Sequence, residues 1–170
     1  MLRRDSIRAF LDALPDHLDG EWILLGGALV ALLLDGDRGT EDIDLVPRHD
    51  TTGARLRLLS AGDALGLGVE AVNSAAAWFL MRLDGWQDDL LVLRQQEDLT
   101  IWRPGPRLFV RTKLGRMSER DLADCLLMLD AEGAGLDWSR VRQEAEALQE
   151  HTDQPAAHAR RARLLDALPS

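Results

Sequence analysis

The longest apolar run of this 170-residue chain, Trp22 to Leu34, is interrupted in its middle by two adjacent glycines. Residues Glu21 to Leu25 predict a short buried strand. Residues Ala28 to Leu34 predict a buried helix, because Ala and Leu favour helix over strand. The run is thirteen residues long, whereas a membrane-spanning helix needs about twenty. We therefore expect a strand, a glycine turn and a helix inside a folded core, and no membrane partner.

Composition excludes several classes of protein. The formal net charge of −9 argues against a protein that coats nucleic acid by charge alone. The single cysteine, Cys125, excludes a disulfide framework and a cysteine-based zinc site. The N-terminal residues include arginines, but no apolar stretch of signal-peptide length follows them, so we expect a cytoplasmic protein.

The rest of the chain alternates short strand patterns with helical ones, which predicts an α+β or α/β fold. We expect a core over residues 1–116 and a C-terminal helical segment, 117–170, packed on that core. In the helix predicted at 52–61, Leu56 and Leu59 are expected to be buried, and residues 108–112 fit either a strand or the start of a helix. The other helices are predicted at 5–14, 118–132, 137–149 and 155–167, and the other strands at 42–46, 66–72, 90–94 and 99–103.

Two aspartates occur in an alternating stretch that predicts a strand. Side chains two residues apart in a strand point the same way, so Asp42 and Asp44 share one face while Ile43 and Leu45 face the core. Two carboxylates this close repel unless a cation lies between them, and Mg²⁺ prefers carboxylate oxygens together with water or phosphate oxygens. The pair therefore predicts a metal platform for phosphoryl or nucleotidyl transfer. Two solvated acids on an edge strand would show the same pattern.

Polar and glycine residues nearby fit phosphate binding. Gly26 and Gly27 allow backbone N–H groups to approach a phosphate without obstruction by a Cβ atom, and a helix N-terminus favours an anion. Arg38 and Thr40, just before the aspartate strand, have the chemistry to clamp a phosphate and to donate a hydrogen bond to it. A tight turn and an ordinary polar loop remain the alternatives for these residues.

The order and spacing of these groups resemble the nucleotidyltransferase (polymerase beta-like) superfamily. The resemblance implies a minimal nucleotidyltransferase fold, in which a small mixed sheet is flanked by helices with a C-terminal helical part. It implies that the two aspartates hold Mg²⁺ and that the glycines, the arginine and the threonine contact a nucleoside triphosphate. The common family form has Ser where this chain has Ala28. The matching segments are Gly26-Gly27-Ala28, Arg38-Gly39-Thr40 and Asp42-Ile43-Asp44-Leu45-Val46.

One short segment of this acidic chain is positive. Residues 101–116 contain no acid, and they include Lys113, the single lysine beside nineteen arginines. Such an island is either a face that pairs with surrounding acids or a site for a phosphate-bearing ligand. Trp102, inside it, fits core packing or stacking on a base. The basic residues of the island are Arg103, Arg107, Arg111, Lys113 and Arg116.

A second block resembles nucleotidyltransferase-like proteins akin to the AbiE toxin family. It consists of Lys113-Leu114-Gly115-Arg116 followed by Arg120-Asp121-Leu122-Ala123-Asp124. The resemblance implies that Lys113 and Arg116 contact nucleotide phosphates. It also implies that Asp121 orients Lys113 or supports the metal site, in the cleft that holds the aspartate pair. From the residues alone, Asp121 also fits an acid at a helix N-terminus, where its spacing from Ser118 is close to that of a capping box. Asp124 fits a surface pair with Arg116 or Arg120.

The resemblance predicts a Mg²⁺-dependent nucleotidyltransferase whose catalytic residues are Asp42, Asp44, Lys113 and Asp121. The acceptor would be a hydroxyl of RNA or protein, and a cognate antitoxin is an expected partner. Many superfamily members carry a third carboxylate on a later strand, and no residue here has a compelling context for it. Without one, no general base for the acceptor hydroxyl is identified, and activity would be weak, restricted or lost. The alternative function is a degenerate, non-catalytic module that binds a nucleotide or partner. A purely structural role, such as that of an antitoxin, is a third reading. The candidates for the third acid are Glu70, Asp88, Asp89 and Asp98.

Overall fold

The computed structural model describes residues 1–34, 37–49, 52–68, 71–73, 77–151 and 154–169. The chain divides into two compact units, Met1–Pro104 and Gly105–Ser170, which we call unit 1 and unit 2. The division falls twelve residues before the boundary expected after residue 116. Residues 108–112 explain the shift, because they form a helix that packs on other helices of unit 2 rather than a strand of the sheet.

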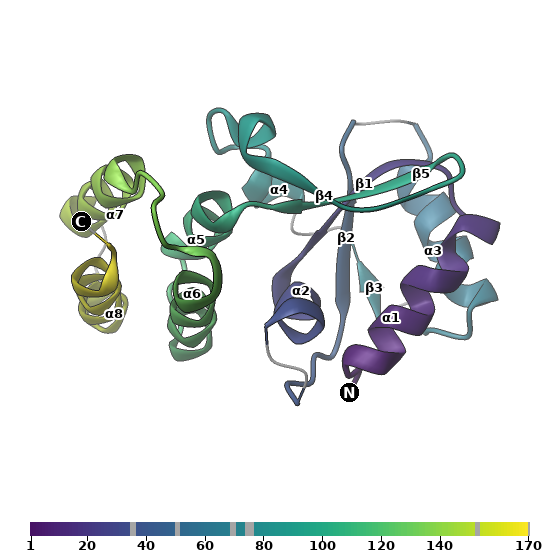
Figure 1. The fold of residues 1–170 in the computed structure, drawn as a ribbon, viewed down its shortest axis with the longest axis horizontal. Coiled ribbons are helices and arrows are strands. Elements are labelled where there is room, and N and C mark those ends of the chain that lie inside the picture. The colour runs from purple at the N-terminus through teal and green to yellow at the C-terminus, as the bar shows by residue number, and fades with distance from the viewer. Residues whose placement is uncertain (35–36, 50–51, 69–70, 74–76, 152–153, 170) are drawn as a thin grey trace. The chain divides into compact units, whose positions relative to one another are not determined.

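Unit 1 is a mixed sheet with helices, which confirms the α+β class. The strands lie in the order β3-β2-β1-β5-β4 (Figure 1). Its helices and strands are α1 (Arg4–Ala13), the 3₁₀ helix η1 (Leu14–Asp16), β1 (Gly20–Leu25), α2 (Gly26–Leu33), β2 (Ile43–Pro47), α3 (Ala54–Ala64), β3 (Val72–Asn73), α4 (Ala77–Leu80), the 3₁₀ helix η2 (Trp86–Asp89), β4 (Leu90–Gln96) and β5 (Leu99–Pro104).

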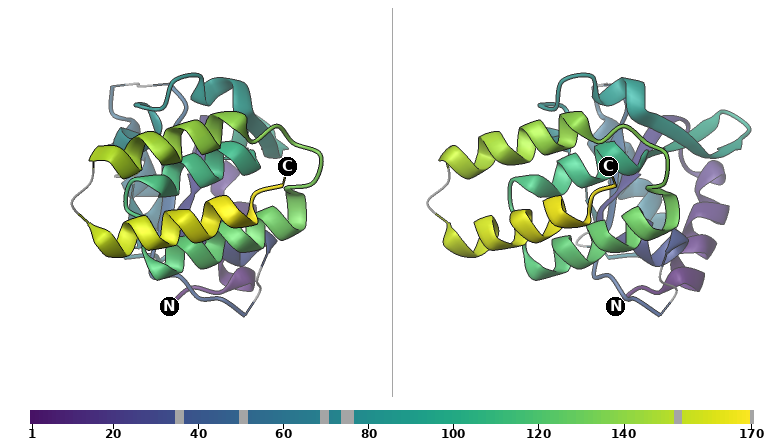
Figure 2. Two further views of the ribbon diagram at one scale, coloured as in Figure 1. Left: turned by 90° about the vertical axis from the view of Figure 1, so that its left-hand side faces the viewer. Right: turned by 60° about the vertical axis from the view of Figure 1, so that its left-hand side comes forward.

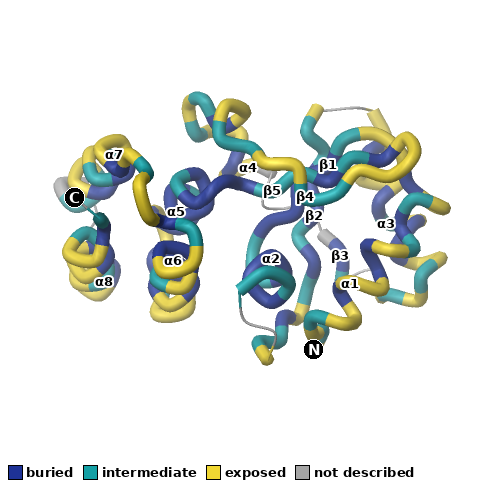
Figure 3. Tube along the Cα trace, in the orientation of Figure 1, coloured by how far each residue is buried: buried dark blue, intermediate teal, exposed yellow. Residues whose placement is uncertain are grey.

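The central strand of the sheet is β1. It pairs antiparallel with β2 and parallel with β5, while β3 extends β2 in parallel and β4 forms a hairpin with β5. Ile23 and Leu24 of β1 are fully buried, as expected for a strand with neighbours on both sides. The edge strand β4 is largely half-buried or exposed (Figure 3). The hairpin predicted at 90–94 and 99–103 is confirmed, with each strand slightly longer.

The helices of unit 1 cover the sheet through their apolar faces. Helix α1 packs on α2, α2 lies against β1 and β2, and α3 lies against β3. Two expectations were wrong here. The buried face of α3 repeats every three or four residues through Ala54, Leu58 and Ala61. Leu58 is therefore the buried leucine, whereas Leu59 is half-buried and Leu56 is exposed. Within the strand expected at 66–72, the described residues form strand only from Val72.

The described residues of unit 2 form four helices, α5 (Pro106–Leu114), α6 (Glu119–Glu132), α7 (Ser139–His151) and α8 (Pro155–Ala167). Helix α5 packs on α6 and α7, and α8 packs on the same two helices, so the four form a closed bundle. Their axes run in similar directions (Figure 2). The bundle encloses an apolar core that includes Val110, Leu122, Trp138 and Leu164. No helix of the described residues is both long and apolar enough to cross a membrane.

Candidate functional site

The junction between β1 and α2 brings a glycine against a carboxylate. Leu25 is extended and pairs in register with Asp44, and the chain enters α2 at Gly26 with φ of +66°. A Cβ atom at position 26 would collide with the Asp44 carboxylate. Gly26 is therefore required both by its left-handed backbone and by this close approach. The Asp44 carboxylate thus lies at the N-terminal end of α2, where the helix dipole favours negative charge.

The predicted alternation in β2 is confirmed. Ile43 and Leu45 are fully buried, while Asp42 and Asp44 are half-buried. Asp42 directly precedes β2 and Asp44 lies within it, so the alternation of strand side chains would place the two carboxylates on one face of the sheet. This arrangement fits a Mg²⁺ ion, which would take one or two protein carboxylates and fill its other positions with water and phosphate oxygens.

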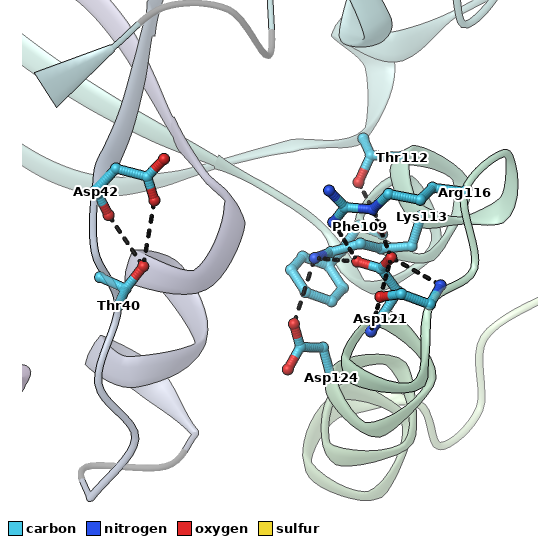
Figure 4. A network of polar contacts seen from close by, with 9 residues as sticks. Thr40, Asp42, Phe109, Thr112, Lys113, Arg116, Asp121 and Asp124 are labelled. Atoms are coloured by element: carbon cyan, nitrogen blue, oxygen red, sulfur yellow. Dashed lines mark hydrogen bonds and ion pairs between the residues drawn. The ribbon is translucent and has the colours of Figure 1, made fainter. Parts of the chain in front are cut away.

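Thr40 is a buried neighbour of Asp42. Its backbone pairs with Leu2, and its side chain is buried. The hydroxyl donates towards the Asp42 carbonyl oxygen at 3.1 Å and lies 3.4 Å from carboxylate Oδ1 (Figure 4). These contacts orient Asp42. Arg38 and Gly27 are half-buried, and their expected phosphate contacts stay predictions.

Lys113, on the last turn of α5, is almost completely enclosed. Its Nζ donates to Asp121 Oδ1 at 3.0 Å and to Asp124 Oδ2 at 3.3 Å, and it lies 5.5 Å from the centre of the Phe109 ring (Figure 4). Both aspartates come from α6, so the ion pairs join two neighbouring helices of unit 2. Among the described residues, two carboxylates accept from the ammonium, which leaves the third of its N–H groups for a further acceptor.

Asp121 is the centre of this network. Its carboxylate accepts hydrogen bonds from Lys113, from Arg116 at 2.7 and 2.8 Å, and from the backbone and hydroxyl of Ser118. Ser118 in return accepts from the Asp121 backbone N–H, which completes the predicted capping box of α6. Burial alone would raise the pKa of Asp121. The hydrogen bonds from Arg116 and Ser118 and the charge of Lys113 outweigh burial and hold the pKa far below its usual range.

Asp124 corrects one reading of the sequence. We expected a surface acid paired with Arg116 or Arg120, but only 1% of its side chain is exposed and it contacts Lys113. A buried acid with a buried lysine eleven residues earlier leaves no signal in helical periodicity, because charged residues usually mark a solvated face. Asp124 is therefore a member of the site that sequence reasoning missed.

The positive island proves to be extensively paired with acids. Arg111 donates to Glu144 of α7 at 2.8 Å, Lys113 contacts two aspartates, and Arg116 contacts Asp121. The pairing alternative is thus confirmed for these three residues. Arg116 nevertheless keeps 75% of its side chain exposed, so it is the accessible cation of the three.

Trp102, in unit 1, is engaged on its face and its edge. The Arg48 guanidinium lies 4.2 Å from the centre of its ring, and its Nε1 donates to Glu21 at 3.1 Å. Glu21 also contacts Arg48 at 2.7 Å and His49 at 3.0 Å. The base-stacking role considered for Trp102 would have to use the opposite face of the ring.

No third carboxylate stands beside Asp44 among the described residues. Its register partner in β3 is Asn73, an amide residue, and Glu70 lies outside the described residues. Asp98 is at the start of β1, since its carbonyl accepts from Gly20, whereas Asp44 is opposite the last residue of β1. Asp88 and Asp89 precede β4, which two strands separate from β2. The described residues also contain no cluster of three side chains suited to a metal ion.

Comparison of the chain with protein-family models, curated proteins and solved structures finds no match. The two resemblances therefore stand on the residues quoted for them. What the structure contributes is the geometry of each block within its own unit: the aspartate pair and glycine junction in unit 1, and the Lys113 network in unit 2.

Proposed function

We propose that this chain is a cytoplasmic nucleotidyltransferase-fold protein that binds a nucleoside triphosphate with Mg²⁺. The reaction would transfer the nucleotidyl group to a hydroxyl of RNA or protein, within a toxin–antitoxin pair. An acceptor oxygen would form a bond to the α-phosphorus, pyrophosphate would leave, and the acceptor proton would pass to a base. The family assignment behind this proposal rests on the sequence resemblance.

The observation that carries the proposal is the junction of Gly26 with Asp44. It sets a carboxylate strand against the start of a helix through a glycine that no other residue can replace without displacing the acid. An anion-binding helix end and a pair of cation-binding carboxylates are the two elements that a metal-bound triphosphate requires. An aspartate that served only in an ion pair or a helix cap would not need a second carboxylate beside it or a glycine turn next to it.

Each residue of the proposed site has a separate task. Asp42 and Asp44 would hold Mg²⁺, which supplies charge neutralisation to the phosphates when bound. Thr40 contacts Asp42, and Gly26 and Gly27 would present the helix N–H groups to a phosphate. By resemblance, Lys113 and Arg116 would contact the phosphates, Asp121 would orient both, and Arg38 would add a further cation.

A degenerate binding module is the second candidate, and one observation favours it. The residue beside Asp44 in β3 is Asn73, so the neighbouring strand offers no acid there to activate an acceptor hydroxyl. Such a protein would bind a nucleotide, or a partner, without turnover. The alternative shares the metal and phosphate site but not the transfer step.

Calorimetry of the full chain with Mg²⁺ and each of the four nucleoside triphosphates tests binding. Incubation with triphosphates labelled at the α-phosphate, together with total RNA or total protein, tests transfer. Asp42→Asn combined with Asp44→Asn should abolish metal-dependent binding. Asp63→Asn, which changes an exposed carboxylate of α3 in the same unit, is the matched control and should bind as the native chain does.

The outcomes separate the candidates. Binding with label transfer supports the enzyme, and binding without transfer to any acceptor supports the module. Unchanged binding in the double variant would remove the aspartate site from both proposals. Absence of binding, together with co-purification of a protein encoded beside this chain, would favour the structural-partner reading.

A further inference from the structure

The turn between α5 and α6 fixes the geometry of the Lys113 network. It runs from Leu114, the last residue of α5, to Ser118, the N-cap of α6, and so sets the distance between Lys113 and Asp121. Within it, Met117 is fully buried and has φ of +38°, a left-handed conformation that costs a residue with a side chain about 1 kcal/mol or more. A strained turn of this kind persists only where the surroundings hold it.

Arg161 of α8 contacts the first end of this turn. Its Nη1 donates to the carbonyl oxygen of Leu114 at 3.0 Å, where the terminal carbonyls of α5 have no partner within the helix. The residue is 0% exposed, and neither its Nε nor its Nη2 has a hydrogen-bond partner among the described residues. A buried guanidinium with two unsatisfied groups is a poor choice for stability, since an apolar side chain of similar size would fill the site at lower cost.

Arg160, the preceding residue, contacts the other end. Its Nη1 donates to the carbonyl oxygen of the strained Met117 at 3.2 Å, and its Nε donates to Glu119 at 2.8 Å. Glu119 is the first residue of α6, so Arg160 joins the turn to the helix that carries Asp121. Two adjacent arginines of α8 therefore donate to the two carbonyls that bound the turn.

We propose that Arg160 and Arg161 are positioning residues that hold Leu114 and Met117, and through them keep the Lys113 ammonium against Asp121 and Asp124. The importance of this arrangement for phosphate binding rests on the proposed function, but the arrangement itself does not. Helix α8 then contributes to the Lys113 network. The proposal also gives a physical reason for the buried guanidinium of Arg161, at a position where an apolar side chain would cost less.

The single lysine of the chain gives a direct measurement of this positioning. An amine-reactive acetylating reagent has two targets, the Lys113 ε-amine and the N-terminal α-amine, and mass spectrometry of the peptides distinguishes them. Lys113 reacts only when its ion pairs open, so its rate relative to the α-amine reports the open population. This readout needs no nucleotide and no activity.

Arg161→Met separates positioning from stability. It removes the bond to Leu114 but keeps an unbranched apolar stem, so the thermal midpoint should stay equal or rise. The rate of Lys113 acetylation should nevertheless increase roughly tenfold, as expected for the loss of one charge-assisted hydrogen bond. Arg161→Lys keeps a donor for Leu114, so acetylation of Lys113 should again be slow. The substitution adds a second reactive amine at position 161, and acetylation there is followed on a separate peptide.

The controls decide the result. Arg160→Gln should also accelerate acetylation of Lys113, whereas Arg163→Gln, an exposed neighbour on α8 that lies 3.7 Å from Glu119, should not. Unchanged Lys113 acetylation in a folded Arg161→Met protein overturns the proposal. If that variant does not fold, Arg160→Gln gives the same decision. Weaker binding of Mg²⁺–triphosphate in the variants that free Lys113 would link positioning to function, and unaltered binding would count against the proposed function alone.

Discussion

The carboxylate of Asp44 fills the space that a side chain on Gly26 would need. The two residues are eighteen positions apart, and the antiparallel register of β1 with β2, Leu25 opposite Asp44, brings them together. The contact links the left-handed entry into α2 with the acid proposed to bind Mg²⁺. A change at the glycine should therefore affect both the stability of unit 1 and the proposed metal site.

Gly26→Ala should lower the free energy of unfolding and weaken Mg²⁺ binding together. An alanine with positive φ costs about 1–2 kcal/mol, and its Cβ atom must also displace the Asp44 carboxylate. Urea denaturation measures the first effect, and calorimetric titration with Mg²⁺ and a nucleoside triphosphate measures the second. Gly66→Ala isolates the backbone term, because Gly66 has φ of +73° but no atom near the position of its Cβ. Equal loss of metal affinity in both variants would contradict the Gly26–Asp44 account.

The lowered pKa of Asp121 predicts a defined pH dependence. A carboxyl whose pKa is lower in the folded state stabilises the fold fully above its unfolded pKa, here 3.8, and loses that contribution as the pH falls towards the folded value. Asp121→Asn should therefore lower the free energy of unfolding by about 3 kcal/mol at pH 7. The difference in free energy of unfolding between the variant and the native chain should stay constant from pH 7 to pH 5 and should become smaller below about pH 4.

Urea denaturation of the native chain and of Asp121→Asn across this pH range measures the difference between their free energies of unfolding. The titration of the other acids largely cancels in that difference. Asp137→Asn is a useful comparison, since Asp137 is fully exposed and should give a small difference at every pH. A difference for Asp121→Asn that is the same at pH 3 and pH 7 would show that the charge of Asp121 is not what stabilises the network.

Local patterns predicted most elements of this fold but not their contacts. The apolar alternation around Asp42 gave β2 its correct inward face, and Ser118 with Asp121 predicted the capping box of α6. Both features depend on neighbours within four residues. The sequence does not decide between strand and helix for residues 108–112, because a short apolar run fits both equally. Their packing on α6 and α7 favours the helix that the structure shows.

Contacts between distant residues left no comparable signal. The approach of Asp44 to Gly26 depends on a strand register that the sequence does not encode locally. Arg161 resembles a residue of a solvated helix face, yet it is buried because the bundle closes over α8. The burial of Asp124 also depends on a contact between helices, since its partner Lys113 comes from α5.

Lys113 and Asp124 should show a strong energetic coupling. Lys113→Met leaves two carboxylates buried with less compensation and should lower the free energy of unfolding by about 3 kcal/mol. Asp124→Leu should also destabilise, because it leaves the lysine with one partner. In the double variant apolar side chains replace both charges and Arg116 still pairs with Asp121, so the loss should be smaller than the sum by about 1–3 kcal/mol. Additive losses in urea denaturation would indicate that the 3.3 Å contact contributes nothing.

Cys125 should be inert in the folded protein. Burial raises the pKa of its thiol to about 12, an effect that the nearby Lys113 charge only partly offsets, and the residue is fully buried in the core of unit 2. Because the thiolate is the reactive form, iodoacetamide at pH 8 should leave the native chain unmodified over hours and should label it rapidly in urea. Mass spectrometry gives the extent of labelling. Fast labelling without denaturant would mean that the unit 2 core opens readily.

If the resemblance holds for both blocks, Lys113 and the carboxylates proposed to bind Mg²⁺ contact the same nucleotide. Lysine labelled with carbon-13 gives signals from one residue only, because the chain has a single lysine. Mn²⁺ in place of Mg²⁺, added with a nucleoside triphosphate, should broaden those signals strongly if Asp42 and Asp44 hold the ion near the phosphates that Lys113 contacts. Asp42→Asn combined with Asp44→Asn should abolish the broadening at the same Mn²⁺ concentration, whereas Asp63→Asn should preserve it. Sharp lysine signals in a chain that demonstrably binds the Mn²⁺–triphosphate would remove Lys113 from the site and leave the carboxylates as its metal-binding part.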